Sequence, residues 1–276
     1  MTYLISVSSA PIARFGNKNY YDLVGTIEVM RRILNESVVD GFELQLEPEW
    51  DSENPPLSDG QFADWTKIPK YSAAQVVELV KRENLPILSV HGSRDIGIYL
   101  CSGRAKDFQK GKRLIFDALS LAQNLGAKVC VFHLWDTWKT KLDLKRLEKA
   151  LSSVAIEFPI VRASVENVPT HVKGQTPLML VKSFDYVTLD LRWASMYDEL
   201  DPFKSISDKI VNVHLRGRLD TGRWFLDQSS FGFYEAFSKI RDEWGYSGLF
   251  TVEPDGPKDE TLFQSFLEAM RSLREV

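Results

Sequence analysis

The 276-residue sequence has few cysteines, no long apolar stretch and little net charge, and each lack excludes a class of protein. Its two cysteines, Cys101 and Cys130, form no CxxC pair and no zinc spacing. Few cysteines without a disulfide framework are typical of a reducing compartment, so we expect a cytoplasmic protein. No apolar stretch approaches the roughly 18 residues that span a membrane, so we expect no membrane partner.

The sequence also lacks the features by which nucleotides and nucleic acids are usually bound. Its formal net charge is −4, without the clustered basic excess typical of nucleic-acid-binding proteins. A local basic patch on an acidic protein can still bind DNA, but we do not expect a nucleic-acid partner. Neither a GxGxxG nor a GxxxxGK[ST] loop occurs, so nothing indicates nucleotide binding.

What the chain does have is a regular alternation of short β-branched runs and longer amphipathic segments. The alternation predicts eight strands, at residues 3–8, 41–47, 87–91, 128–135, 160–166, 186–191, 209–215 and 249–253. It predicts helices at residues 22–36, 72–84, 104–124, 143–157, 177–183, 202–206, 233–244 and 259–273. Eight such units favour a (β/α)₈ TIM barrel, an α/β fold, as one domain over residues 1–276. An open doubly wound sheet has the same local alternation but usually fewer units.

Metal-capable side chains follow four consecutive strands at the same relative position. They are Glu166, Asp190, His214 and Glu253. The carboxyl ends of barrel strands converge around the axis, so we expect these four side chains to meet there. A cation would remove the repulsion between three carboxylates, and this donor set suits Mn²⁺, Mg²⁺, Co²⁺ or Zn²⁺. Any one of them alone would more often be an ordinary cap or surface residue.

This order of ligands resembles that of the xylose isomerase-like barrel superfamily, which includes ketose 3-epimerases, hydroxypyruvate isomerase, inosose dehydratase and endonuclease IV. The second strand adds Gly41-Phe42-Glu43-Leu44, which is similar to the G-x-E-[LI] common in that superfamily. The resemblance implies a metal-dependent sugar isomerase or epimerase that works through an enediolate. Glu166 and Glu253 would face opposite sides of the substrate carbon chain as the two catalytic bases, and Glu43 or His91 would bind a distal hydroxyl.

Two further histidines, His91 and His133, end the third and fourth strands. In endonuclease IV, histidines at matching places join the glutamate of the fifth strand to hold an additional zinc. His91, His133 and Glu166 could therefore bind a second metal ion. In sugar isomerases of the same superfamily such a histidine contacts substrate hydroxyls, and a purely structural role is the third alternative.

Trp193 departs from the pattern of the superfamily. Endonuclease IV carries D-x-x-H on the sixth strand, and the ketose epimerases carry a substrate-binding histidine at the same place. Here the segment reads Asp190-Leu191-Arg192-Trp193, and an indole cannot ligate a metal ion. The departure argues against an endonuclease IV-like phosphodiesterase and also puts an epimerase-like substrate pose in doubt.

Arginines and tryptophans near the strand ends predict the rest of the pocket. Arg192 and Arg216 each lie two residues past a predicted ligand, on the same face of the strand, and Arg218 follows. Guanidinium groups suit a carboxylate or phosphate, so a sugar acid or sugar phosphate is a candidate substrate. The alternative is that these arginines pair with the ligand carboxylates.

Two long loops, residues 48–71 and 217–232, follow strands and would lie on the catalytic face. They carry Trp50 and Trp224, which we expect to contact the sugar, although aromatic side chains are more often core residues. Other functions remain open at this point: a phosphodiesterase, a dehydratase or lyase on the same metal site, or a non-catalytic sugar-binding barrel. An oligomer is also open.

Overall fold

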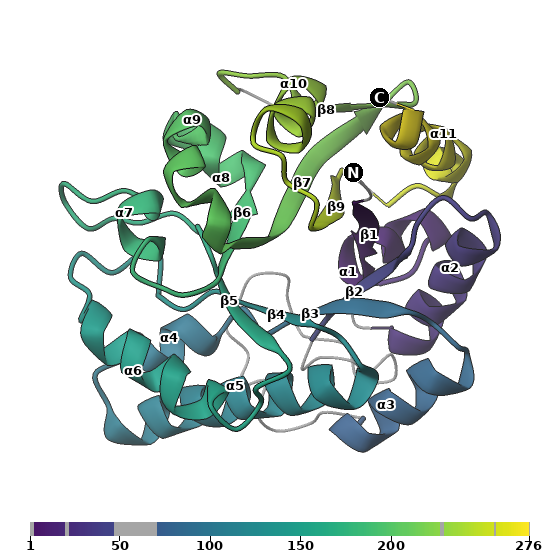
Figure 1. The fold of residues 1–276 in the computed structure, drawn as a ribbon. Coiled ribbons are helices and arrows are strands. Elements are labelled where there is room, and N and C mark those ends of the chain that lie inside the picture. The colour runs from purple at the N-terminus through teal and green to yellow at the C-terminus, as the bar shows by residue number, and fades with distance from the viewer. Residues whose placement is uncertain (1–2, 20–21, 47–70, 227–228, 257, 276) are drawn as a thin grey trace.

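Eight parallel strands close into a barrel in the computed structural model, which describes residues 3–19, 22–46, 71–226, 229–256 and 258–275 (Figure 1). The order around the sheet is β6-β5-β4-β3-β2-β1-β9-β7, and pairing of β6 with β7 closes it. The strands are β1 (Leu4–Ser8), β2 (Gly41–Gln45), β3 (Ile87–His91), β4 (Val129–Phe132), β5 (Arg162–Glu166), β6 (Val187–Asp190), β7 (Ile210–Asp220) and β9 (Leu249–Asp255). The predicted TIM barrel is confirmed.

Helices surround this sheet and bury its outer face (Figure 1). The longer ones are α2 (Leu23–Asn35), α3 (Ala73–Arg82), α5 (Ala105–Leu125), α6 (Leu144–Ala155) and α11 (Phe263–Glu275). The shorter ones are α1 (Ser9–Ile12), α4 (Ile96–Cys101), α7 (Pro177–Val181), α8 (Leu191–Met196), α9 (Leu200–Phe203) and α10 (Phe233–Ser238). Short 3₁₀ segments lie at Ala13–Gly16, Lys204–Lys209 and Glu260–Leu262, and a π segment at Lys239–Glu243. In the described part of the chain, no helix combines the length and apolarity needed to cross a membrane.

Helix ends follow local sequence rules. Ser72 caps α3 as expected: its hydroxyl accepts from the Gln75 amide, and the Gln75 side chain accepts from the Ser72 amide. Gly126 ends α5 in the left-handed region, with φ 78°. Each rule fixes the residue at which the helix begins or ends, and so the point at which the chain can turn toward the next strand.

The inside of the barrel carries a layer of buried polar side chains beneath these strand ends. Ser6 bonds to Thr251 at 2.8 Å, and Thr251 donates to Asn212 at 2.9 Å. Ser164 and Thr188 pair across β5 and β6 at 2.7 Å. All five are fully buried. Because buried polar groups need partners, the layer provides a fixed, hydrogen-bonded floor for whatever lies above it.

Residues 217–225, the first part of the long loop that we predicted at 217–232, form a hairpin instead. Strand β7 continues to Asp220 and pairs with an antiparallel strand, β8 (Arg223–Phe225). The two residues between them, Thr221 and Gly222, both have positive φ, at 46° and 74°. Positive φ at both central positions is typical of the tight hairpin turn whose twist matches that of the strands.

Three short helices that we did not predict, α1, α4 and α8, lie close after the carboxyl ends of β1, β3 and β6. Helix α8 follows β6 without a loop because the Asp190 side chain caps it, accepting from the Trp193 amide at 3.1 Å. The apolar run of the strand therefore passes directly into the helix. No loop marks the point at which the hydrophobic pattern changes from the strand repeat to the helix repeat, so the sequence did not reveal the helix. These helices bring their side chains to the rim of the barrel.

Candidate metal centre

The four predicted ligands lie on neighbouring strands: Glu166 and Asp190 end β5 and β6, whereas His214 and Glu253 lie within the longer strands β7 and β9. His214 Nδ1 lies 3.3 Å from Glu166 Oε2 and 3.5 Å from Glu253 Oε1. Asp190 lies beside His214 in the strand register. Glu166, Asp190 and His214 are buried, whereas the Glu253 side chain is 12% exposed. The structure therefore brings three of the four together by direct contact and places Asp190 next to them.

Glu43 lies beneath His214, not at the cavity where we expected it to bind a substrate hydroxyl. Its Oε2 accepts from the Ser89 hydroxyl at 2.8 Å and the Asn212 amide at 3.1 Å, and lies 3.2 Å from His214 Nε2. Glu43 is fully buried because the polar layer of the barrel encloses it. A proton on Nε2 shared with Glu43 leaves the Nδ1 lone pair of His214 available to a metal ion.

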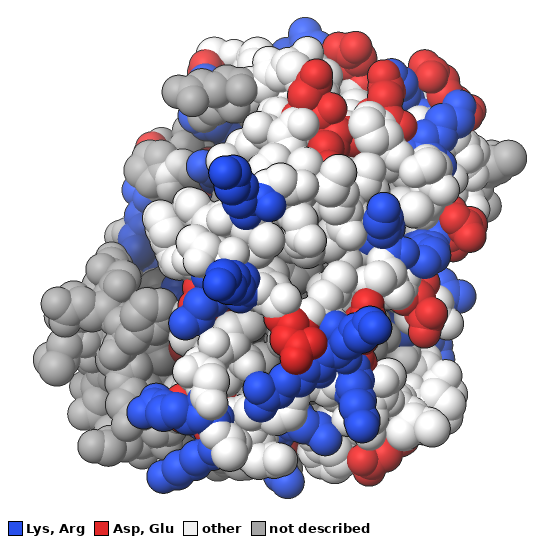
Figure 2. Space-filling view, turned by 90° about the vertical axis from the view of Figure 1, so that its left-hand side faces the viewer, with Lys and Arg blue, Asp and Glu red and all other residues white. Residues whose placement is uncertain are grey.

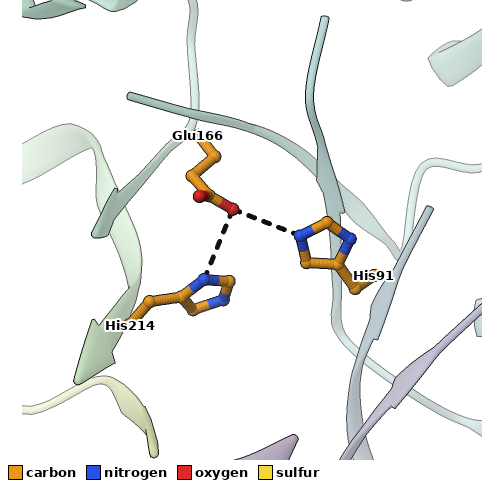
Figure 3. Close-up of side chains that lie close together, drawn as sticks. All are labelled: His91, Glu166 and His214. Atoms are coloured by element: carbon orange, nitrogen blue, oxygen red, sulfur yellow. Dashed lines mark hydrogen bonds and ion pairs between the residues drawn. The ribbon is translucent and has the colours of Figure 1, made fainter. Parts of the chain in front are cut away.

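His91 and His133 both reach Glu166. The Nε2 atom of each lies 3.2 Å from Glu166 Oε2, and their rings meet edge to face at 4.8 Å. His91 Nδ1 donates to the Gly92 carbonyl at 2.9 Å, which orients its ring. Figure 3 shows His91 and His214 approaching the same oxygen of Glu166. His91, Glu166 and His214 thus form a group that could hold a metal ion, as do Glu43, His214 and Glu253.

Trp193 contacts two of the predicted ligands, Glu166 and Asp190, and sequence reasoning missed these contacts. Its indole Nε1 donates to Glu166 Oε1 at 3.1 Å, and its backbone amide donates to Asp190 Oδ1 at the same distance. Asn167 holds the Asp190 backbone from the other side, accepting at 2.6 Å from the Asp190 amide. Trp193 therefore binds one oxygen of each carboxylate, and the other oxygen of Glu166 faces the histidines.

Charge in the cluster shifts the protonation of its imidazoles. Burial alone would lower the pKa of His214, but three nearby carboxylates more than offset it and raise that pKa well above its ordinary value. The three are Glu43, Glu253 and Glu166. Burial would likewise lower the pKa of His91, but its contacts with Glu166 and Glu43 raise it to about 9.

The pKa values of the carboxylates Glu166 and Asp190 shift in opposite directions. Burial would raise the pKa of Glu166, but His133 and His214 lower it well below its ordinary value. Burial raises the pKa of Asp190 to about 7, and the Glu166 charge acts in the same direction. In the protein alone, protons therefore compensate the excess of negative charge at these strand ends.

Two buried ligand atoms that form no hydrogen bond within the described residues fit a bound cation. They are Asp190 Oδ2 and His214 Nδ1, and the latter lies within ion-pair distance of Glu166 and Glu253. Leaving Asp190 Oδ2 without a partner costs about 1–3 kcal/mol, so a native site usually supplies one. With Glu166 and Glu253 beside them, the set of carboxylate oxygens and one imidazole nitrogen suits a divalent cation.

A cavity of about 230 Å³ opens above these ligands. Its wall includes Glu166, Glu253 and three arginines, Arg14, Arg94 and Arg216. Sequence reasoning found Arg216 but missed the other two, because each belongs to a segment after a strand, where residue spacing gives no direction. The cavity thus combines acidic groups at its base with guanidinium groups on its wall.

The predicted arginines differ in position. Arg216 Nε donates to Asp255 at 3.2 Å, and its guanidinium lies over the Trp193 ring. Arg192 reaches the same Asp255 at 3.1 Å, at the exposed rim. Arg218 pairs with Asp220 on the β7–β8 hairpin and does not line the cavity. Only Arg216 of the three forms part of the wall.

The two predicted aromatic contacts also differ. Trp224 is 1% exposed, and its ring packs against Phe233 and Phe266, because the β7–β8 hairpin folds onto α10 and α11. It lies in the hydrophobic core, the alternative we held open for such residues. Trp50 lies outside the described residues.

Charge on the outer surface is mixed. Figure 2 shows the face that carries α6 and α7, where blue basic and red acidic side chains are interspersed. Among the described residues of this face, acidic and uncharged side chains lie between the basic ones.

Solved structures with the same fold include several sugar epimerases. The D-allulose 3-epimerase from Methylomonas sp. superposes with a TM-score of 0.64 at 14% identity, over 98% of this chain and 96% of that one. The 3-keto-D-glucoside 4-epimerase from E. coli gives 0.62 at 15%, over 100% of both chains. An AP endonuclease, family 2, from Brucella melitensis gives 0.60 at 18%, over 96% and 99%. At these identities the likeness shows the fold alone.

No protein with a curated description matches the sequence. The family described as xylose isomerase-like TIM barrel matches residues 32–276, which is most of the chain and includes every predicted ligand. The chain therefore belongs to the xylose isomerase-like TIM barrel family.

Proposed function

We propose that this chain is a divalent-metal-dependent sugar isomerase or epimerase. The observation that carries the proposal is the placement of Glu166 and Glu253. Both line one cavity, and each lies within 3.5 Å of His214 Nδ1, a buried atom without a hydrogen bond. Two carboxylates across one small cavity can act on the same bound carbon atom. The epimerases that share the fold support the proposal in kind.

The residues that would hold the cation are Glu166, Asp190, His214 and Glu253. When bound, a divalent cation polarises the substrate carbonyl and stabilises the negative charge of an enediolate. Its identity, among Mn²⁺, Mg²⁺, Co²⁺ and Zn²⁺, is open. A second cation beside His91 and His133 is also open, as is direct contact of these histidines with substrate hydroxyls.

Glu166 and Glu253 divide the proton transfer. One carboxylate removes the proton from the carbon next to the carbonyl, and the other returns a proton to the opposite face of that carbon. Return to the opposite face inverts the centre and gives an epimer, whereas return to the neighbouring carbon gives an aldose–ketose isomerisation. Loss of a hydroxyl group from the same enediolate would make the protein a dehydratase.

The arginines on the cavity wall favour a substrate with an anionic group. Burial lowers the pKa of Arg14, the Asp255 charge opposes this shift, and the nearby charge of Arg216 adds to it. Asp255 is the one carboxylate contacted by both Arg192 and Arg216. A carboxylate or phosphate on the sugar would offset this positive charge.

One specific observation keeps a phosphodiesterase as the second candidate. His91, Glu166 and His214 form a metal-capable group, which a two-metal hydrolase would need. Against it, Trp193 occupies Glu166 Oε1 and offers no ligand. Cleavage of abasic DNA by the metal-loaded protein, with no action on sugars, would favour this candidate.

The test of the isomerase proposal uses Glu166→Gln and Glu253→Gln, with Glu157→Gln, in the exposed turn after α6, as the matched control. The proteins are loaded with Mn²⁺ and mixed in D₂O with ketoses, sugar acids and sugar phosphates. NMR then follows deuterium incorporation next to the carbonyl. We expect incorporation with the wild type and the control, and a loss of roughly 100-fold or more with each active-site variant. Near wild-type turnover by either variant contradicts the two-base scheme.

The charge of the substrate is tested with a matched set: D-fructose, D-fructuronate and D-fructose 6-phosphate. We expect tighter binding of the carboxylate or phosphate than of the neutral ketose. Arg216→Lys should weaken binding of the anionic member by roughly 10-fold, because the planar guanidinium fork is lost. Arg218→Lys, outside the cavity wall, is the control. Equal binding of all three sugars contradicts an anionic substrate.

A further inference from the structure

One side chain outside the predicted ligand set, Trp193, touches two of its carboxylates. Its indole N–H donates to Glu166 Oε1, and its backbone N–H donates to Asp190 Oδ1, both at 3.1 Å. The two acceptors lie on different strands, β5 and β6, and the residue itself belongs to α8. A single residue therefore links two strand ends at the base of the cavity.

These bonds leave a different oxygen of each carboxylate for other partners. On Glu166, the second oxygen, Oε2, lies 3.2 Å from His91 Nε2 and 3.3 Å from His214 Nδ1. On Asp190, the second oxygen, Oδ2, is buried and forms no hydrogen bond within the described residues. His133 Nε2 also lies 3.2 Å from Glu166 Oε2. The last torsion of a glutamate is broad, so contacts at Oε2 alone leave the plane of the carboxylate variable, and the indole bond at Oε1 fixes that plane.

Tryptophan suits this task better than histidine does. The indole nitrogen is a donor only, so it neither ligates a cation nor accepts a proton. The ring also lies under two guanidinium groups, with Arg192 at 5.3 Å and Arg216 at 5.4 Å from its centre. The partly buried ring packs against the core, which holds it in place.

We propose that Trp193 is a positioning residue that aims Glu166 Oε2 and Asp190 Oδ2 at a divalent cation. This inference rests on the metal site of the proposed function. Trp193 is the residue that stands where endonuclease IV and the ketose epimerases have a histidine. The inference gives it a role at the metal site. Partners that orient a ligand from behind typically change metal affinity by about 10–100-fold when they are removed.

Trp193→Phe isolates the indole bond. Phenylalanine keeps the backbone N–H that bonds to Asp190 and keeps an aromatic face for Arg192 and Arg216, but it has no donor for Glu166. Trp138→Phe is the matched control, because Trp138 is 77% exposed and contacts His171, away from the cavity. Circular dichroism and the melting temperature establish that both variants are folded.

The experiment is titration of metal-stripped protein with Mn²⁺ by calorimetry, together with the visible absorption spectrum of the Co²⁺-loaded protein. We expect the Kd for Mn²⁺ to rise roughly 10–100-fold in Trp193→Phe, with an altered Co²⁺ spectrum. Trp138→Phe should match the wild type in both. Equal Mn²⁺ affinity and identical Co²⁺ spectra in wild type and Trp193→Phe overturn the role of Trp193 alone.

Other results separate this inference from the proposed reaction. If the wild type binds no Mn²⁺, both the metal site and the role of Trp193 are overturned. If Trp193→Phe binds Mn²⁺ weakly but neither protein acts on any sugar, the role of Trp193 stands and the proposed reaction does not. If Trp193→Phe fails to fold, a crystal structure of the wild type with Mn²⁺ decides. The inference requires that the indole N–H donates to the Glu166 oxygen that does not bind the cation. An indole turned to solvent in that structure overturns the inference.

Discussion

The two halves of the barrel contribute different groups to one site. Strands β5, β6, β7 and β9 carry the four proposed ligands, of which Glu166 and Glu253 line the cavity. Glu43 on β2, His91 on β3 and His133 directly after β4 contact those ligands from below and from the side. On the proposed function, the second half would hold the cation, and these three residues of the first half would join Trp193 in orienting its ligands.

Exposure varies within each half: the His133 side chain of the first half is 27% exposed and lines the cavity, whereas Asp190 and His214 of the second half are fully buried. In the first half, Glu43 is fully enclosed by the polar layer, so no substrate can reach it. In the second half, the Glu253 side chain is 12% exposed and open to the cavity. Reactive groups in barrels of this type lie at the carboxyl ends of strands, and support for them lies deeper in the barrel.

The largest effect on metal binding should come from a ligand of the second half. Asp190→Asn replaces a charged oxygen by an amide at a site where Oδ2 has no other partner. We expect the Mn²⁺ affinity to fall further than the roughly 10–100-fold typical of supporting residues. Calorimetric titration measures this, and Asp185→Asn, at an exposed position before β6, is the control. Retained affinity in Asp190→Asn would remove Asp190 from the ligand set.

An intermediate effect should come from the first half. Glu43→Gln keeps the shape of the side chain but weakens its bond with His214 Nε2, 3.2 Å away. We expect roughly 10–100-fold weaker Mn²⁺ binding, with the same stoichiometry as the wild type, because the ligands remain. A loss of Mn²⁺ affinity as large as that of Asp190→Asn would contradict the view that Glu43 only supports the ligands. No change at all would show that His214 is oriented without Glu43.

The smallest effect on the site should come from the β7–β8 hairpin. Gly222 has φ 74°, which an alanine adopts only with strain, and an added Cβ meets only ordinary contacts. Gly222→Ala should lower the free energy of unfolding by about 1 kcal/mol and leave the Mn²⁺ Kd unchanged. Chemical denaturation measures the first and calorimetry the second. A changed Kd would extend the site to the hairpin.

The sequence predicted the barrel and the four strand ends because both follow from local pattern. Alternating apolar runs mark each strand, and a polar residue directly after one must lie near the barrel axis. The prediction of a loop was wrong for residues 217–225, which form a hairpin, because the turn reads Thr221-Gly222 and lacks the usual Asn-Gly.

What spacing could not predict is the direction of a side chain once the sheet has closed. Glu43 points into the polar layer and not to the cavity, and Trp224 turns into the core with the hairpin. Arg14 reaches the cavity from a segment far from any predicted ligand in the sequence. Trp193 was recognised as a departure, but its bond to Glu166 depends on α8 starting directly at Asp190.

The most direct test of the metal site is a crystal structure of the wild-type protein soaked in MnCl₂, with data collected to locate manganese by anomalous scattering. We predict a peak in contact with Glu166, Asp190, His214 and Glu253, on the oxygen of Glu166 that does not bind Trp193. A peak held by His91 and His133 without Asp190 or Glu253, or no peak at these strand ends, would contradict it.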